Sequence, residues 1–164
     1  MRIFGFAGWS GSGKTTLIEQ LIPRFVKHGL RVSLIKHAHH TFDVDHAGKD
    51  SYRHRQAGAQ EILVTSSRRW VLMHELRGEA EPAFEDQVKR VSPCDLLLVE
   101  GFKHAPIPKL EVWREQTGEG LLHPNDPHIV AVASDAKVET KLPLLDLNDV
   151  DGIAQFILKK LELQ

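Results

Sequence analysis

A glycine-rich segment near the start of the chain has the residue types and spacing of a phosphate-binding loop. Residues 8–15 read Gly-Trp-Ser-Gly-Ser-Gly-Lys-Thr, which matches the pattern G-x-x-x-x-G-K-[ST] in full. Glycines let backbone N–H groups converge on an anion, and the start of a helix adds free donors. Lys14 is expected to reach the β- and γ-phosphates of a nucleotide, the Thr15 hydroxyl to ligate Mg²⁺, and Thr16 to contact the α-phosphate. The predicted nucleoside triphosphate site comprises Gly8, Ser10, Gly11, Ser12, Gly13, Lys14, Thr15 and Thr16.

Magnesium at such a loop needs a further oxygen ligand, and Glu100 is the best-placed carboxylate. Residues 95–100 read Asp-Leu-Leu-Leu-Val-Glu, and apolar residues between two acids are typical of a buried central strand. The carboxyl end of such a strand faces the ligand crevice of an open parallel sheet. Gly101 permits a tight turn beside a ligand, whereas Asp95 lies at the opposite end of the strand. Glu100 is therefore predicted to lie by the magnesium ion, and a solvated strand end is the alternative.

A second phosphate-facing loop is predicted before the second helix. Residues 45–48 read Asp-His-Ala-Gly. In this D-x-x-G spacing the aspartate contacts magnesium through water, and the glycine amide meets the γ-phosphate. The D-x-x-G pattern alone is weak evidence for a phosphate site. It carries more weight here because it comes after the second expected strand, where a loop can reach the nucleotide. Asp45, Gly48 and Asp50 are the candidate residues, with simple helix capping as the alternative for the acids.

Asp135, toward the end of the chain, is a candidate for distinguishing guanine from adenine in the bound nucleotide. It directly follows the apolar segment 129–134, which reads as a strand. A carboxylate there can accept hydrogen bonds from guanine N1–H and N2–H₂, and adenine lacks these donors. Asp135 is thus a candidate guanine contact that favours GTP, and a turn-initiating aspartate is the alternative.

The loop after the second expected strand is unusually rich in histidine. Five of the ten histidines in the chain lie in residues 37–54, namely His37, His39, His40, His46 and His54. Imidazole and carboxylate ligands without nearby thiolates would favour Zn or Ni over Cu(I). The alternative is a solvated loop whose histidines and lysines contact an anionic ligand or partner. Lys36 and His37, at the end of the strand, point at the expected ligand crevice.

Hydrophobic spacing predicts the elements that position these residues. A strand over 3–7, a helix over 15–27 and a strand over 32–35 form a βαβ unit, which implies parallel pairing and a right-handed crossover. Further helices are expected over 52–57, 82–91 and 149–163, and further strands over 61–65, 70–74, 95–100, 109–113, 128–134 and 144–145. The alternation predicts an α/β fold of three layers, a P-loop NTPase fold whose mostly parallel sheet has helices on both faces.

Length and composition indicate one domain over residues 1–164. The chain carries 21 Lys and Arg against 22 Asp and Glu, a net charge of −1, which argues against a general nucleic-acid or membrane-surface binder. The single cysteine, Cys94, excludes an intramolecular disulfide and a Cys-rich zinc site. The apolar stretch at the start is too short for a signal peptide or a membrane span, so we expect a cytoplasmic protein.

The ordered set of motifs resembles a known family. The phosphate loop, residues 35–40, residues 45–51 and the segment Leu-Val-Glu-Gly-Phe-Lys over 98–103 are similar to those of the MobB-type GTP-binding proteins of molybdopterin-guanine dinucleotide biosynthesis. The resemblance extends from Phe4 to the last helix. It implies GTP and Mg²⁺ as ligands, a homodimer, weak GTP hydrolysis and an adapter role. The implied partners are the molybdopterin nucleotidyltransferase, which joins GMP to molybdopterin, and other molybdenum cofactor proteins.

The same resemblance implies roles for individual positions. Residues 11–16 would bind phosphates, Glu100 would lie by the magnesium ion, residues 45–50 would form the second phosphate-facing loop, and Asp135 would lie near the base. No motif places a glutamine or an arginine to orient water or to act as an arginine finger. Without one, turnover of GTP is expected on the order of 10⁻⁴ per second.

Two other functions compete with the adapter. A GTPase metallochaperone would carry Ni or Zn on the His-rich loop 37–54. A small-molecule kinase would need an arginine-bearing lid, for which Arg68 and Arg69 are the candidates, although residues 70–72 behind them look like a plain strand. The adapter is favoured, mainly through the resemblance.

Overall fold

The computed structural model describes residues 1–38 and 42–163, and the chain divides into two compact units. The first unit comprises Met1–His37 and Gln87–Gln164, and the second comprises Ala38–Asp86. Helix α3 (Phe84–Arg90) spans the boundary between them. The expectation of one domain over 1–164 stays a prediction.

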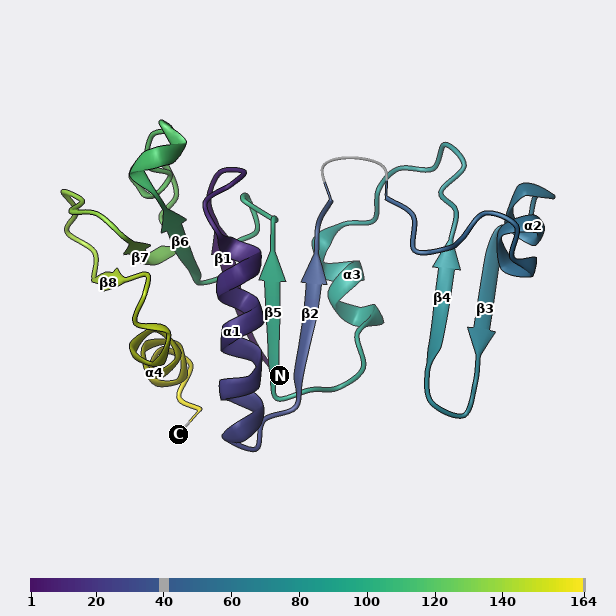
Figure 1. Ribbon diagram of the computed structural model, residues 1–164, viewed down its shortest axis with the longest axis horizontal. Helices are drawn as coiled ribbons and strands as arrows, with labels where there is room; N and C mark the ends of the chain where they lie inside the picture. The colour runs from purple at the N-terminus through teal and green to yellow at the C-terminus, as the bar shows by residue number, and fades with distance from the viewer. Residues whose placement is uncertain (39–41, 164) are drawn as a thin grey trace. The chain divides into compact units, whose positions relative to one another are not determined.

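The first unit is built on a six-stranded sheet in which every neighbouring pair is parallel (Figure 1). The strand order is β2-β5-β1-β6-β7-β8, so β1 lies between β5 and β6. The bounds are β1 (Arg2–Ala7), β2 (Val32–Lys36), β5 (Leu96–Glu100), β6 (Lys109–Trp113), β7 (Ile129–Ser134) and β8 (Leu144–Asp146). The predicted α/β fold with a mostly parallel sheet is confirmed.

Two helices cover one face of this sheet and form the main core with it. Helices α1 (Lys14–Lys27) and α4 (Val150–Lys160) lie side by side, with α1 alongside β1 and β5 (Figure 1). Alternate strand residues point to one face. Those that pack in the core with the helices include Phe4, Phe6, Leu96, Leu98, Leu110, Val112, Ala131 and Ala133. The buried side chains of α1 recur at helical spacing and are Leu17, Ile18, Leu21 and Phe25.

The opposite face of β6 carries two buried charged side chains, Lys109 and Glu111, which are 1% and 0% exposed. The Lys109 ammonium donates to the carbonyl oxygens of Lys103 at 2.6 Å and Ala105 at 3.0 Å, and it lies 2.6 Å from an Asp126 carboxylate oxygen. Glu111 accepts hydrogen bonds from the Leu122 amide at 2.5 Å and the His123 amide at 2.9 Å. These bonds fasten the loops on either side of β6 to the sheet.

The second unit contains a helix and a separate hairpin. Helix α2 (Asp50–Gln56) precedes strands β3 (Glu61–Thr65) and β4 (Trp70–His74), which pair antiparallel in a two-stranded sheet of their own. Both strands were expected within these bounds. The sequence analysis did not predict that these two strands form a sheet separate from the parallel one.

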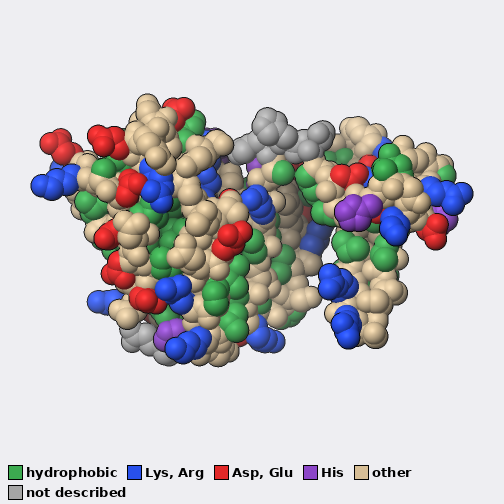
Figure 2. All heavy atoms as spheres, in the orientation of Figure 1, with side chains coloured by type: hydrophobic (Ala, Val, Ile, Leu, Met, Phe, Trp, Pro, Cys, Tyr) green, Lys and Arg blue, Asp and Glu red, His purple; other side chains and the backbone are tan. Residues whose placement is uncertain are grey.

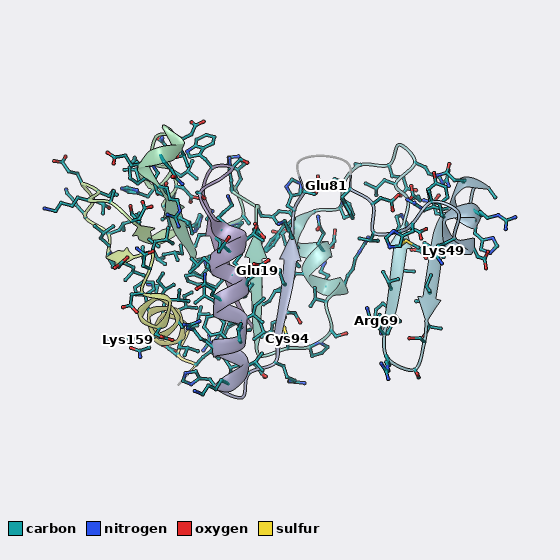
Figure 3. The ribbon with its side chains drawn as sticks, in the orientation of Figure 1. Glu19, Lys49, Arg69, Glu81, Cys94 and Lys159 are labelled. Atoms are coloured by element: carbon teal, nitrogen blue, oxygen red, sulfur yellow. The ribbon has the colours of Figure 1, made fainter. Side chains whose placement is uncertain are left out.

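Several element ends differ from the sequence prediction. Helix α3 begins at Phe84 instead of residue 82. Helix α4 ends at Lys160, and two short 3-10 turns, η1 (Glu115–Thr117) and η2 (His123–Asn125), lie between β6 and β7. Among the described residues, no helix is both long and apolar enough to cross a membrane. Cys94 is buried and unpaired just before β5, at the end of that strand away from Glu100 (Figure 3).

Candidate functional site

The phosphate loop follows β1 and opens onto the start of α1. Gly8, Gly11 and Gly13 have φ values of 148°, 79° and 91°, which favour glycine. A Cβ on Gly8 would also collide with the carbonyl oxygen of Val112. Gly13 caps α1 without a side-chain hydrogen bond, so the first amides of the helix keep their capacity to bind an anion. The local backbone therefore has the form that an anion-binding loop requires.

The side chain of Lys14 folds back over this loop. Its ammonium donates to the carbonyl oxygens of Gly8 at 2.9 Å and Trp9 at 2.8 Å. Burial lowers the pKa of Lys14, Glu100 partly opposes the shift, and the positive charges of Lys103 and Lys36 lower the pKa further. An anion at the loop would relieve this destabilisation of the charged form. The phosphate-binding role expected of Lys14 agrees with this position and stays a prediction.

Glu100, Thr15 and Lys36 form a compact cluster beside the loop. Strand β5 pairs with both β1 and β2, which brings the carboxyl ends of all three strands together. The Thr15 hydroxyl donates to Glu100 Oε1 at 2.6 Å. The Lys36 ammonium lies 3.2 Å from Thr15 Oγ1 and 3.3 Å from Glu100 Oε2. Glu100 is 5% exposed, so the structure places a buried carboxylate at this strand end rather than a solvated one.

This cluster fits a hard divalent cation. Magnesium prefers oxygen ligands, and the Thr15 hydroxyl and the Glu100 carboxylate are adjacent oxygens at the edge of the phosphate loop. The Lys36 ammonium lies against both groups and neutralises the carboxylate in the absence of another cation. Thr15 and Glu100 are the residues that would hold magnesium, and Lys36 would have to withdraw from them. The turn after Glu100 is tight, because a Cβ on Gly101 would lie 2.9 Å from the His37 carbonyl oxygen.

The predicted second loop has well-defined partners within the second unit. Asp45 Oδ1 accepts hydrogen bonds from the His46 amide and the Ser51 hydroxyl, both at 2.9 Å. Asp45 Oδ2 is buried 3.7 Å from Arg55 Nε, and neither atom has a hydrogen-bond partner among the described residues. Asp50 is the first residue of α2, and Gly48 has a φ of 89°. The phosphate and magnesium roles of Asp45, Gly48 and Asp50 stay predictions.

The same network surrounds Arg55, which is 13% exposed. Its guanidinium donates to Asp43 at 2.6 Å and to Glu75 at 3.1 Å. The bond from Arg55 holds the pKa of Asp43 below its ordinary value, with help from the Asp45 amide. Arg55 therefore ties the start of this segment to the residue that follows β4.

The histidine-rich loop lies only partly within the described residues, because His39 and His40 fall outside them. The His37 ring packs against Phe102, with 4.9 Å between ring centroids. Across residues 1–38 and 42–163, no group of three or more His, Cys, Asp or Glu side chains is arranged to hold a metal ion. The described part of the chain thus lends no support to a Ni or Zn site.

Arg114 is a site residue that the sequence analysis missed. It follows β6 directly, and its Nε donates to the carbonyl oxygen of Ser12 at 3.3 Å. Its Nη1 is bonded to Asp135 Oδ2, which follows β7. The rule that picked out Glu100, a polar residue at the carboxyl end of a parallel strand, applies equally to Arg114. The expectation that no glutamine or arginine orients water or acts as an arginine finger stays a prediction.

Trp9, within the phosphate loop, is the second missed residue. Its indole N–H donates to the Gly120 carbonyl oxygen at 2.7 Å, and the Lys103 ammonium lies 4.1 Å from the ring centroid. These contacts attach the loop to the segments after β5 and β6. A tryptophan at a variable position of the motif gives no sequence signal for such contacts.

Comparison with known proteins agrees with this architecture. The family described as MobB, molybdopterin guanine dinucleotide synthesis protein B, matches residues 3–135. The molybdopterin-guanine dinucleotide biosynthesis adapter protein of Escherichia coli (strain K12) is 46% identical over 167 residues, which cover 99% of this chain and 94% of the relative. That of Haemophilus influenzae is 41% identical over 155 residues, covering 94% of this chain and 86% of its own.

Solved structures show the same fold. The crystal structure of Bacillus subtilis MobB has a TM-score of 0.77 at 27% identity, with 98% of both chains covered. A MobB protein homolog from Bacillus stearothermophilus has a TM-score of 0.74 at 22% identity and covers 100% of both chains. The resemblance expected from the motifs is confirmed, and the chain belongs to the family of molybdopterin-guanine dinucleotide synthesis protein B.

Proposed function

We propose that this protein binds GTP with Mg²⁺, hydrolyses it slowly and acts as an adapter in molybdopterin-guanine dinucleotide biosynthesis. The observation that carries the proposal is the phosphate loop with Lys14 over it and the Thr15–Glu100 pair, 2.6 Å apart, at its edge. The relatives from E. coli and H. influenzae are both named adapter proteins of this biosynthesis. The partners on this proposal are the molybdopterin nucleotidyltransferase and other molybdenum cofactor proteins.

The contacts of Thr15 and Glu100 support the expectation of slow hydrolysis. The hydrogen bonds and ion pairs of Thr15 and Glu100 within the described residues involve Lys36, and no glutamine or arginine. Arg114 lies at the end of β6, on the other side of β1 from Glu100. Within the described residues, no glutamine or arginine side chain is bonded to Thr15 or Glu100, and we therefore expect turnover on the order of 10⁻⁴ per second. A partner protein would then respond to whether the nucleotide is bound.

Replacing Glu100 with glutamine is expected to weaken the magnesium-dependent part of GTP binding by about tenfold or more, because a neutral amide replaces the buried carboxylate. GTP affinity measured in EDTA should change little. Calorimetric titration with and without Mg²⁺ gives both values. Glu19→Gln, at an exposed position on α1, is the matched control (Figure 3). An unchanged magnesium effect in Glu100→Gln would remove Glu100 from the cation site.

The proposal as a whole is tested by titrating GTP, ATP and GDP with Mg²⁺ and then measuring single-turnover hydrolysis on the same sample. Preference for GTP with slow hydrolysis supports a nucleotide-gated adapter. Preference for ATP, or rapid phosphoryl transfer to an added acceptor, would support a kinase instead. A metallochaperone would bind Ni or Zn tightly and lose the metal when His39 and His40 are replaced by alanine.

A homodimer is part of the proposal, and the β3–β4 hairpin is the surface that supports it. Leu63 and Leu72 are directly opposite each other and share a face with Trp70. Their exposures are 61%, 49% and 64%, and hydrophobic side chains show at the surface of this part of the molecule (Figure 2). A two-stranded hairpin is marginally stable alone, and a twofold axis would place the same apolar face against itself.

Leu63→Glu is therefore expected to shift the protein from dimer to monomer, because it places a charge in the centre of the apolar face. The mass in solution, measured by light scattering after gel filtration, reports the change. Ser67→Glu adds the same charge at an exposed position in the hairpin turn and should leave the mass unaltered. A Leu63→Glu protein that keeps the dimer mass would place the dimer interface elsewhere.

A further inference from the structure

The paired side chains of Arg114 and Asp135 lie where the base of a bound nucleotide is expected. We propose that Arg114 reads the O6 and N7 edge of guanine and that Asp135 is the positioning residue that holds its guanidinium. The inference rests on the proposed nucleotide site and names the feature of that site that selects GTP.

The order of the strands separates two halves of the site. Glu100 and Lys36 end β5 and β2 on one side of β1, whereas Arg114 and Asp135 follow β6 and β7 on the other. The cation and the terminal phosphate belong with the Thr15–Glu100 pair. A triphosphate bound across the loop that follows β1, with its terminal phosphate at that pair, would place its base on the side of β6 and β7. Arg114 is therefore a base-side residue.

The guanidinium of Arg114 is fixed at two points and has one free end. Nε is bonded to the Ser12 carbonyl oxygen at 3.3 Å and Nη1 to the Asp135 carboxylate. Nη2 has no hydrogen-bond partner in the part of the chain that the structure describes. A Cβ on Gly13 would lie 3.3 Å from Nε and 3.6 Å from Nη2, so the guanidinium lies directly over the loop. The Arg114 side chain is 28% exposed and open to a ligand.

A donor held in this way distinguishes the two purines. Guanine presents two acceptors, O6 and N7, and arginine pairs with that edge more often than with any other. Adenine presents an N6 amino group in place of O6, so an arginine there faces another donor. Asp135 Oδ2 is already bonded to the guanidinium. The first role of Asp135 is therefore to hold Arg114 in place, and contact with the base is secondary.

The test measures dissociation constants of GTP, ITP and ATP, each with Mg²⁺, for the wild type and for Arg114→Ala. ITP keeps O6 and N7 but lacks the N2 amino group. We expect GTP and ITP to bind the wild type in preference to ATP. In Arg114→Ala, both should weaken by about tenfold to 100-fold while ATP changes little. Asp135→Asn should lose part of the same preference.

Arg24→Ala is the matched control, because Arg24 in the same unit is also paired with an aspartate, Asp151, at 2.5 Å. Its nucleotide preferences should equal those of the wild type. An equal loss of affinity for all three nucleotides in Arg114→Ala would mean that Arg114 only supports the phosphate loop, and it would overturn the inference. A wild type that binds ITP no better than ATP would also overturn it. Failure of the wild type to bind any triphosphate would instead refute the proposed function.

Discussion

Lys14→Ala is expected to lower the affinity for GTP by about 100-fold or more while the protein stays folded. A hydrogen bond to a charged group contributes about 1.5–3 kcal/mol, and the ammonium would make at least two such bonds to the β- and γ-phosphates. In the structure its donors already point into the loop, at 2.9 Å and 2.8 Å from the carbonyl oxygens of Gly8 and Trp9. The side chain fills no space in the core, so its removal leaves the packing of α1 intact.

Calorimetric titration of GTP with Mg²⁺ measures the effect, and a urea unfolding curve confirms that stability is retained. Lys27→Ala removes an exposed lysine from the other end of the same helix and should leave GTP affinity unchanged. If Lys14→Ala binds GTP as the wild type does, the loop over residues 8–15 is not the phosphate site.

The sequence allows prediction of the strand positions and of the arrangement around Glu100, and both predictions have one physical reason. Strands buried on both faces read as apolar runs, and parallel strands place all their carboxyl ends at one edge. The run 95–100 therefore predicted both a central strand and the placement of Glu100 near the phosphate loop. The structure shows that arrangement, with Thr15 bonded to Glu100. Here the chain topology alone determines which residues meet.

The contacts of Arg114, Asp45 and Lys109 could not be predicted from the sequence, because they depend on which side chains meet in the folded chain. Arg114 meets Ser12 and Asp135 only once β6 is known to neighbour both β1 and β7. Asp45 is held by Ser51 and lies against Arg55, which the D-x-x-G spacing does not reveal. The hydrophobic pattern does not show where the charge of Lys109 is neutralised.

Because Asp126 neutralises the buried Lys109 ammonium, its loss should lower the stability of the first unit strongly. The Lys109 ammonium is 1% exposed and lies 2.6 Å from Asp126 Oδ2, while the His128 amide donates to Oδ1 at 2.9 Å. Removing one member of a buried ion pair leaves the other charge uncompensated and costs about 3 kcal/mol or more. The two carbonyl oxygens that also bind Lys109 accept hydrogen bonds but carry no full negative charge.

Asp126→Asn is thus expected to lower the free energy of unfolding by about 3 kcal/mol at pH 7, measured by urea unfolding. Asp151→Asn is the control, since its pair with Arg24 is 74% exposed on the aspartate side and should contribute little to stability. Equal effects of the two substitutions would show that Lys109 is adequately held by carbonyl oxygens alone.

The pH dependence gives the same prediction an independent readout. Burial of the Asp126 carboxyl acts to raise its pKa, but the bonds from Lys109 and the His128 amide outweigh it and hold the pKa below the ordinary value of 3.8. The stabilisation is therefore fully present above pH 3.8 and is lost as the pH falls through the lower folded-state value. The stability difference between wild type and Asp126→Asn should be constant near neutrality and shrink in acid. A difference that instead grew as the pH fell would mean that the folded protein favours the protonated carboxyl, contrary to the pairing with Lys109.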